Sequence, residues 1–401
     1  MQKLKLAIVT DAFPPLNTSA SVQIKDIALG FVSMGHDVTV MVAANDQKNY
    51  WMTDNYFGVT VLRLYSPKIR DVSHFQRFCS EMLMPYSMLF SLGRSPFNNM
   101  KWDGVIFYSP SIFFTPLVKT LTRRGNCKGY LVLRDMFPEW AVDLGLIRSR
   151  FLYSLLKYFA QKQFYAAEII GVQSKGNLHY FDSLYQLGVN TRVEVLNNWL
   201  GQKEILPLDI SFEDTVLSGR KILIYAGNMG VAQDVGRFID LANRMTKNRE
   251  FGFLFIGRGS EVQTLKDKVL NMGLDNILFM DEILPEQLNN ILENCFAGLV
   301  SLSSHHRSHN IPGKLLNYFR SGIPVLACVN EGNDLIEIIR EHNVGEVCET
   351  DFLDDLFESL NRLILLVEHD NEIKSRCETV FNVYFSVSQA CNQIVNSISD
   401  K

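Results

Sequence analysis

The residues best suited to chemistry lie between positions 305 and 327, directly after a predicted strand at 297–301. A helix is predicted to begin at Asn310-Ile311-Pro312 and to end at Gly322. The start of a helix presents free backbone N–H groups, and Arg307 and Lys314 add positive charge beside them. The segment Pro312-Gly313-Lys314 therefore predicts a site for a diphosphate. The alternative is a surface helix whose basic residues are solvated.

Three histidines precede this helix and raise the question of a metal site. His305 and His309 are four residues apart, but they lie before Pro312 in a predicted loop. No glutamate stands in the H-E-x-x-H arrangement that binds zinc. We therefore expect no metal ion at this position.

A loop rich in glycine follows the predicted strand 221–226. Its candidates for ligand contact are Gly227, Asn228, Gly230 and Gln233. Glycines let a backbone approach a ligand closely, but no Gly-Lys-Ser/Thr follows, and the third glycine of a dinucleotide fingerprint is missing. Residues 257–261, which include Arg258, add a weaker G-x-G signal. Both loops are also compatible with tight turns that bind nothing.

The hydrophobic pattern predicts the elements that position these loops. Short apolar runs alternate with segments of helical periodicity, which is typical of parallel sheets covered by helices on both faces. The predicted strands are 4–9, 37–43, 59–64, 104–108, 130–134, 168–172 and 192–196, followed by 221–226, 253–257, 277–280, 297–301, 323–327 and 345–348. A ligand of such a sheet binds at the carboxyl ends of the strands.

The alternation pauses near residue 200. Residues 201–220 show no clear periodicity, which predicts a linker between two doubly wound, Rossmann-like α/β domains at 1–200 and 221–380. The segment 381–401 is predicted to be helical and to cross back onto the first domain.

Composition narrows the class of protein. Of the 401 residues, 47% are hydrophobic and 20% are charged, which excludes a mainly disordered chain. The net charge of −4 argues against nucleic acid as a partner. The seven scattered cysteines indicate core thiols in a reducing compartment. Because we find no secretory leader and no run of about 18 apolar residues, we expect a cytoplasmic protein.

Taken in order, these motifs resemble those of the family 4 retaining glycosyltransferases of GT-B fold. The resemblance is to the bacterial subgroup that makes O-antigen and capsule sugars and includes the fucosamine transferases. The segments that carry it are Asp11–Pro15, Gly35–Val38, Arg134–Glu139, Asn198-Trp199, Tyr225–Gln233, Gly257–Glu261, Pro312-x-Lys314 and Gly322–Val325. They extend over nearly the whole chain, and they are specific in this order although each is weak alone.

The resemblance implies two domains that face each other across a cleft, with a nucleotide-sugar donor on the second and an acceptor on the first. Transfer would retain the anomeric configuration and need no metal or other cofactor, and UDP is the nucleotide that the family usually uses. The acceptor would be a saccharide carried on a polyprenyl diphosphate. The resemblance further implies a protein associated peripherally with the inner face of the plasma membrane.

Two residues depart from the family pattern. Where the wider family carries two glutamates eight residues apart, this chain has His309, at a catalytic position, and Asn317. Asn317 can still hydrogen-bond the ribose hydroxyls of a donor. These departures leave open a catalytically inactive, transferase-like subunit of a polysaccharide assembly complex. A nucleotide-sugar 2-epimerase, which has the same architecture, is a further alternative.

The first domain offers two catalytic candidates, Asp135 and Glu139, just past the predicted strand 130–134. One hypothesis has Asp135 orient a sugar hydroxyl and Glu139 orient the acceptor. The competing hypothesis is that Asp135 caps the turn around Pro138 and that Glu139 is solvated.

The segment 148–165 combines four basic residues with six aromatic ones and contains no acid. Leu152, Leu155, Leu156 and Phe159 keep helical spacing, so a helix packed in the core is one interpretation. Docking on an anionic lipid surface, together with residues 82–92, is the other.

Overall fold

The computed structural model describes residues 2–143, 145–203, 206, 212–303, 311–330 and 332–400. The chain divides into two compact units. The first comprises Met1–Gly201 together with Val387–Lys401, and the second comprises Gln202–Ser386.

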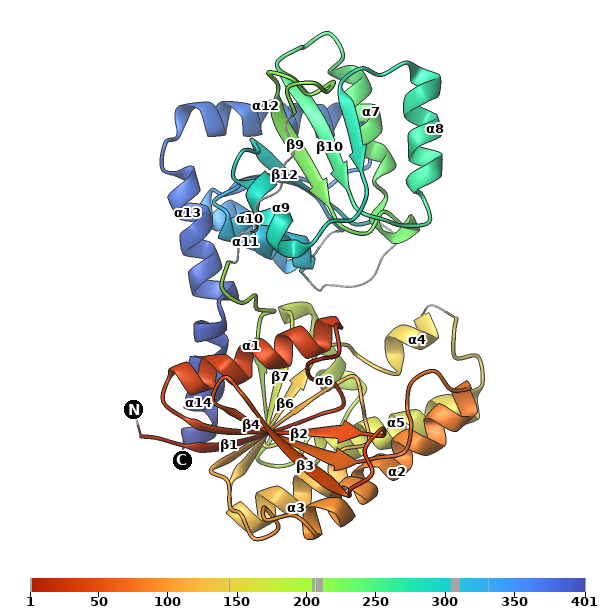
Figure 1. Cartoon of the computed structure of the whole chain (residues 1–401). Coiled ribbons are helices and arrows are strands. Elements are labelled where there is room, and N and C mark those ends of the chain that lie inside the picture. Colours follow the sequence, from red (N-terminus) through yellow and green to blue (C-terminus); the bar gives the residue numbers. More distant parts are fainter. Residues whose placement is uncertain are drawn as a thin grey trace. The chain divides into compact units, whose positions relative to one another are not determined.

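Among the described residues of the first unit, eight strands form one sheet in the order β3-β4-β2-β1-β5-β6-β7-β8 (Figure 1). They are β1 (Lys5–Thr10), β2 (Asp37–Ala44), β3 (Trp51–Tyr56), β4 (Val59–Tyr65), β5 (Gly104–Tyr108), β6 (Lys128–Leu133), β7 (Ile169–Val172) and β8 (Arg192–Val195). Seven of them run parallel, and β3 is antiparallel to β4. The order reverses between β1 and β5, which is where such a sheet binds ligands.

Helices cover both faces of this sheet. Apolar side chains of α1 and α14 pack on one face, and those of α2, α3 and α5 pack on the other. The helices are α1 (Ser19–Ser33), α2 (His74–Gly93), α3 (Thr115–Gly125), α4 (Glu139–Asp143), α5 (Arg150–Phe164), α6 (His179–Ser183) and α14 (Val387–Ser399), with a 3₁₀ turn η1 (Lys175–Asn177).

The hydrophobic pattern does not predict β3, because most of its residues are exposed and show no apolar face. The strand forms a hairpin with β4 through Phe57-Gly58, whose φ angles of 49° and 90° are both positive. Two positive φ angles give a two-residue turn the twist that neighbouring strands require. Each strand that the sequence does predict overlaps an observed one.

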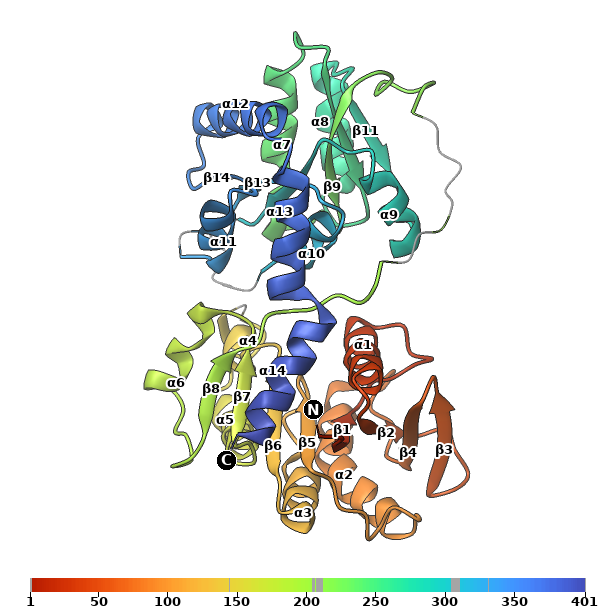
Figure 2. The ribbon, with the colours of Figure 1, turned by 90° about the vertical axis from the view of Figure 1, so that its left-hand side faces the viewer.

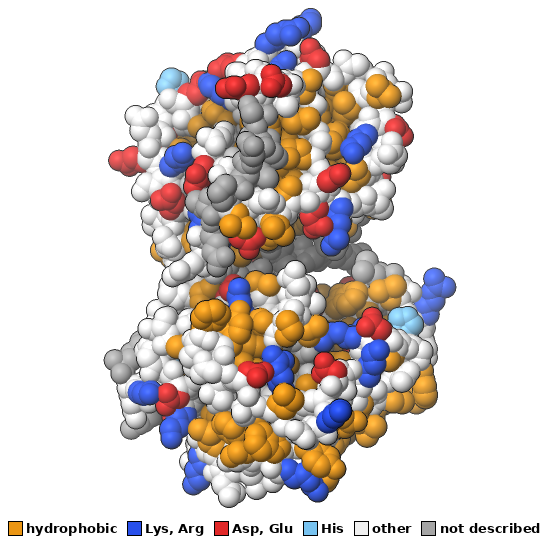
Figure 3. Space-filling view, viewed as in Figure 1, with side chains coloured by type: hydrophobic (Ala, Val, Ile, Leu, Met, Phe, Trp, Pro, Cys, Tyr) orange, Lys and Arg blue, Asp and Glu red, His pale blue; other side chains and the backbone are white. Residues whose placement is uncertain are grey.

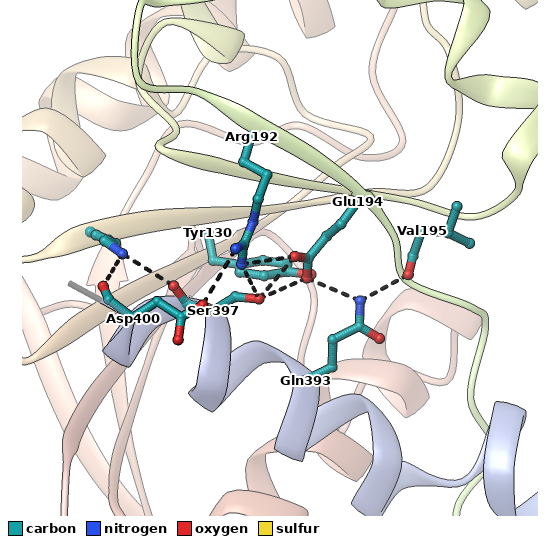
Figure 4. Close-up of polar contacts among 8 residues, drawn as sticks. Tyr130, Arg192, Glu194, Val195, Gln393, Ser397 and Asp400 are labelled. Carbon is teal, nitrogen blue, oxygen red and sulfur yellow. Dashed lines mark hydrogen bonds and ion pairs between the residues drawn. The ribbon is translucent and has the colours of Figure 1, made fainter.

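The C-terminal helix α14 packs against α1 and β6 of the first unit (Figure 2). Gly30 permits the close approach of α1, because a Cβ there would stand 2.6 Å from Cγ1 of Val387 and 2.8 Å from Sγ of Cys391. Near the end of α14, the carboxylate of Glu194 in β8 accepts hydrogen bonds from Tyr130 at 2.8 Å, Ser397 at 2.9 Å and Gln393 at 3.0 Å (Figure 4). It also pairs with Arg192 at 3.1 Å.

In the second unit, the described residues form a parallel sheet of six strands in the order β11-β10-β9-β12-β13-β14. The strands are β9 (Lys221–Ala226), β10 (Phe251–Ile256), β11 (Ile277–Met280), β12 (Ala297–Ser301), β13 (Val325–Cys328) and β14 (Gly345–Cys348). Here the order reverses between β9 and β12.

The helices of the second unit also lie on both faces. Apolar residues of α7, α8 and α12 share one core with the sheet, and right-handed crossovers place α9, α10 and α11 on the other face. The helices are α7 (Gly236–Arg244), α8 (Val262–Met272), α9 (Pro285–Leu292), α10 (Gly313–Arg320), α11 (Asp334–His342), α12 (Leu353–His369) and α13 (Ile373–Val380), with short turns η2 (Val231–Gln233) and η3 (Phe381–Phe385). Within the described ranges, no helix is long and apolar enough to cross a membrane.

Candidate functional site

A pocket of about 340 Å³ opens at the carboxyl ends of β9 and β10 in the second unit. The loop after β11 and the helices α9 and α10 complete its wall. The polar and glycine residues that line it include Gly227, Asn228, Gly257, Glu282, Lys314 and Asn317. The pocket therefore lies beside the point where the strand order reverses, as expected for a ligand site in a parallel sheet.

Two glycines let the loops after β9 and β10 pack backbone to backbone. Gly227 and Gly257 have φ angles of 135° and 140°, which side chains rarely tolerate. A Cβ on Gly257 would stand 2.1 Å from the carbonyl oxygen of Gly227. The N–H of Gly227 donates to the carbonyl of Ile256 at 2.8 Å. The backbone of the glycine-rich loop is thereby held against the neighbouring strand.

Gln233 braces this loop from within. Its Oε1 accepts hydrogen bonds from Nδ2 of Asn228 at 2.8 Å and from the N–H of Gly230 at 3.1 Å. Gln233 is thus placed to fix the loop, whereas Asn228 lines the pocket. Arg258 lies at the rim, where its Nε is 3.2 Å from Oε2 of Glu282, and both side chains are exposed.

Lys314 stands in the first turn of α10, two residues after Pro312. Its Nζ lies 3.5 Å from the centre of the Tyr225 ring. A Cβ on Gly227 would stand 3.5 Å from Cε of Lys314. Burial disfavours the charged form of the amine and lowers the pKa of Lys314 to about 7. A bound anion would favour the ammonium form and reverse this shift.

Two further residues of α10 connect the helix to its surroundings. Tyr318 is fully buried, and its hydroxyl accepts a hydrogen bond from the N–H of Ala226 at 2.9 Å. Gly298 leaves room for this ring, because a Cβ there would stand 2.4 Å from it. Asn317 lines the pocket one turn after Gly313. Lys314 and Asn317 are therefore held in a fixed relation to β9.

Arg307 and His309, which the sequence also nominates, lie outside the described residues. Pro312, Gly313, Lys314 and Asn317 are brought to the pocket or its edge together with Gly227 and Asn228. Within the described parts of the chain, no three His, Cys, Asp or Glu side chains are grouped as metal ligands would be.

In the first unit, Asp135 is exposed just beyond the carboxyl end of β6. The neighbouring Arg134 forms two hydrogen bonds to other residues of the first unit. Its N–H donates to Oγ of Ser109 at 2.9 Å, and its Nη1 donates to Oδ1 of Asn198 at 2.7 Å. Asp135 therefore follows a residue that two hydrogen bonds anchor to the first unit.

Glu139 is buried, with 6% of its surface exposed. Its Oε1 accepts hydrogen bonds from the hydroxyls of Tyr185 at 2.5 Å and Tyr153 at 3.4 Å. Desolvation raises the pKa of this carboxyl above its ordinary value. The hypothesis of a solvated Glu139 is wrong. Both phenols bond Oε1, and Oε2 is buried with no hydrogen-bond partner among the described residues. The role of Glu139 in orienting an acceptor stays a prediction.

Sequence reasoning missed Tyr318 and Glu282, which line the pocket, and Tyr225, whose ring contacts Lys314. A usable signal exists for Glu282, which follows the predicted strand 277–280 and so belongs to the same sheet edge as the glycine-rich loop. The two tyrosines lie within predicted elements. Their roles depend on how β9 and α10 pack together.

Comparison with known proteins finds a family that matches most of the second unit. Residues 209–379 match the family described as glycosyl transferases group 1. The residues that line the pocket lie within this matched segment.

Two bacterial proteins are similar in sequence to this chain. The probable glycosyltransferase WbjE of Pseudomonas aeruginosa is 24% identical over 230 residues, 55% of this chain and 56% of WbjE. The chain thus spans about half the length of WbjE. The putative colanic acid biosynthesis glycosyl transferase WcaI of Escherichia coli strain K12 is 20% identical over 90% of this chain and 92% of WcaI.

A solved structure is similar to this chain over nearly its whole length. Alr3699/HepE of Anabaena, in complex with UDP, superposes with a TM-score of 0.65 at 13% sequence identity. The superposition covers 98% of this chain and 99% of HepE. The chain therefore has the GT-B fold, built from two Rossmann-like units.

Proposed function

We propose that the chain transfers a sugar from a UDP-sugar to a saccharide acceptor, with retention at the anomeric carbon, in the synthesis of O-antigen or capsule. The fucosamine transferases are the subgroup to which we assign it. The observation that carries this proposal is the pocket within the segment that matches group 1, into whose wall α10 brings a lysine beside a glycine-rich loop.

The donor diphosphate is proposed to bind at the start of α10, against Pro312, Gly313 and Lys314, with the ribose at Asn317. The N–H groups of that first turn and the ammonium of Lys314 would stabilise the negative charge of the departing diphosphate. A metal ion could serve the same purpose in other transferases. Because the chain supplies its own cation here, the proposed reaction uses none. The choice of UDP is supported by the UDP complex of HepE.

The acceptor is proposed to bind to the first unit, with Asp135 orienting the hydroxyl that attacks the donor. Asp135 is suited to this task because it is exposed and stands at the carboxyl end of a central strand. We further propose that the acceptor is a saccharide on a polyprenyl diphosphate, which places the reaction at a lipid surface.

A surface of the first unit supports this last point. The helix α5 and the residue that caps its C-terminus expose a stripe formed by Phe151, Tyr158, Lys162 and Tyr165, with Phe151 78% exposed. Phe75, Leu83, Tyr86 and Phe90 of α2 are likewise exposed. Figure 3 shows apolar side chains along the lower right of this unit, where α2 and α5 run in Figure 1. We propose that these two stripes dock reversibly on the inner face of the plasma membrane.

The test of the proposed function is to incubate the purified chain with UDP-sugars, with and without a lipid-linked saccharide acceptor. We expect UDP release and a lengthened acceptor only when both substrates are present. Epimerised donor in the absence of acceptor would instead identify a nucleotide-sugar 2-epimerase. UDP binding with no turnover on any acceptor tried would favour the inactive subunit.

A further inference from the structure

Tyr225, the first residue of the motif Tyr225–Gln233, makes two contacts that the sequence alone does not predict. It is the fifth residue of β9, and its side chain is fully buried. The centre of its ring lies 3.5 Å from Nζ of Lys314. Its hydroxyl donates a hydrogen bond of 2.7 Å to the carbonyl oxygen of Asn228. One buried residue thus touches both the lysine and the glycine-rich loop of the pocket.

The amine of Lys314 is confined between the ring and the loop. The Tyr225 ring lies on one side of it, and the backbone of Gly227 stands near enough that a Cβ would be 3.8 Å from Nζ. A free lysine side chain has four rotatable bonds and loses much entropy when it binds an anion. A lysine already held in place avoids part of that loss.

We propose that Tyr225 is a positioning residue for the donor diphosphate: its ring holds the Lys314 ammonium at the pocket, and its hydroxyl fixes the glycine-rich loop. This inference rests on the proposed function, because the anion that Lys314 meets is the diphosphate of the donor. It adds a residue to that site which contacts no ligand itself.

The physical basis is the charge distribution of the ring. The face of an aromatic ring is negative, and its attraction for a cation is strongest where water is excluded. Burial lowers the pKa of Lys314. The ring acts in the opposite direction, because it stabilises the charged form of the amine. Burial also raises the pKa of the Tyr225 phenol above its ordinary value. The phenol is thus neutral, and it attracts the lysine through its ring face and not through a phenolate charge.

The two contacts can be separated by substitution. Tyr225→Phe keeps the ring and removes the hydrogen bond to the loop. Trifluorophenylalanine, introduced at the same position by suppression of a stop codon, keeps the ring shape but withdraws charge from its face. Monofluorophenylalanine is a milder step if the trifluorinated chain does not fold. Calorimetry would then measure UDP and uridine binding to each full-length variant.

We expect UDP affinity to fall about twofold to thirtyfold from the phenylalanine chain to its trifluorinated counterpart. Uridine affinity should not change, because uridine carries no diphosphate. In a Lys314→Met background the effect of fluorination should vanish, since the ring then has no cation to hold.

Equal UDP affinity for the phenylalanine and fluorinated chains would overturn the inference. So would a loss that persists in the Lys314→Met background, because the ring would then act only through packing. Either result leaves the proposed function standing as long as the wild-type chain binds UDP. A wild-type chain that does not bind UDP overturns the proposed donor and this inference together.

Discussion

The side-chain carbonyl oxygen of Asn317 accepts a hydrogen bond of 3.0 Å from Nη2 of Arg320. A guanidinium group can only donate, so this contact fixes which end of the Asn317 amide is engaged. The same Nη2 donates to Oδ1 of Asn289 at 2.9 Å, which holds Arg320 in place. The NH₂ group of Asn317 is therefore the end that a ligand in the pocket would meet. Where the wider family has a carboxylate that accepts, this chain offers a donor.

Replacing Asn317 tests the proposed ribose contact. Asn317→Leu removes the donor, and we expect UDP affinity to fall by about twofold to tenfold, as for the loss of one neutral hydrogen bond. Asn317→Glu should keep most of the affinity, because a carboxylate can accept from ribose hydroxyls and pair with Arg320. Calorimetry that gives the same UDP affinity for wild type and Asn317→Leu would refute the contact.

The lowered pKa of Lys314 predicts that UDP binding depends on pH. Below a pH of about 7 the amine is already charged, whereas above it the amine must take up a proton to meet the diphosphate. Affinity should therefore decline as the pH rises from about 7, by up to tenfold per pH unit. Calorimetry near pH 8, in buffers of different ionisation enthalpy, should show proton uptake on binding.

The control for this prediction is Lys314→Met, which should bind UDP more weakly and without proton uptake. Proton uptake that is unchanged in Lys314→Met would assign it to another group. An affinity independent of pH in the wild-type chain would contradict the account of Lys314.

The exposed stripe of α5 predicts binding to anionic lipid vesicles. Phe151→Gln with Tyr158→Gln should weaken sedimentation with phosphatidylglycerol vesicles, because both rings are lost from the lipid-facing side. Lys162→Gln should weaken it by about fivefold, the value of one basic residue near the surface. Lys157 is a poor choice for this test, because it is half-buried and its Nζ lies 5.3 Å from the centre of the buried Tyr185 ring. Lys162 is exposed, and the Tyr158 ring that it contacts is exposed as well.

A matched control is available on the second unit, where Leu270 and Phe352 are 80% and 73% exposed. Leu270→Gln with Phe352→Gln should leave vesicle binding unchanged. Equal losses from both pairs would indicate unspecific adhesion, and a wild-type chain that never sediments with the vesicles would exclude this surface as a docking site.

The contact of α14 with α1 predicts a specific loss of stability. Gly30→Ala places a methyl group within 3 Å of Val387 and Cys391, and such overpacking costs about 1–3 kcal/mol of unfolding free energy. Gly93→Ala is the control, because the nearest atom to a Cβ there is 4.0 Å away. Urea denaturation should show the loss for Gly30→Ala alone. Equal stabilities of the two variants would mean that the helices adjust without cost.

The pattern of apolar runs predicts most of the fold, because strands buried on both faces of a parallel sheet are nearly continuous in their apolar residues. It misses β3, which is an exposed edge strand. The pocket loops are predictable because they follow strands. The contact of Lys314 with Tyr225 is not, since it depends on the packing of α10 against β9. Nor is the burial of Glu139, whose partner Tyr185 lies 46 residues further along the chain.

Binding of a nucleotide-sugar diphosphate in the pocket beside Lys314 can be measured by the thermal shift that UDP causes. A ligand that binds only the folded chain raises its melting temperature. UDP should raise the melting temperature of the wild-type chain, and uridine should raise it less. Lys314→Met should abolish most of the difference between the two ligands. Equal shifts with UDP and uridine, or a UDP shift that survives unchanged in Lys314→Met, would contradict binding of the diphosphate beside Lys314.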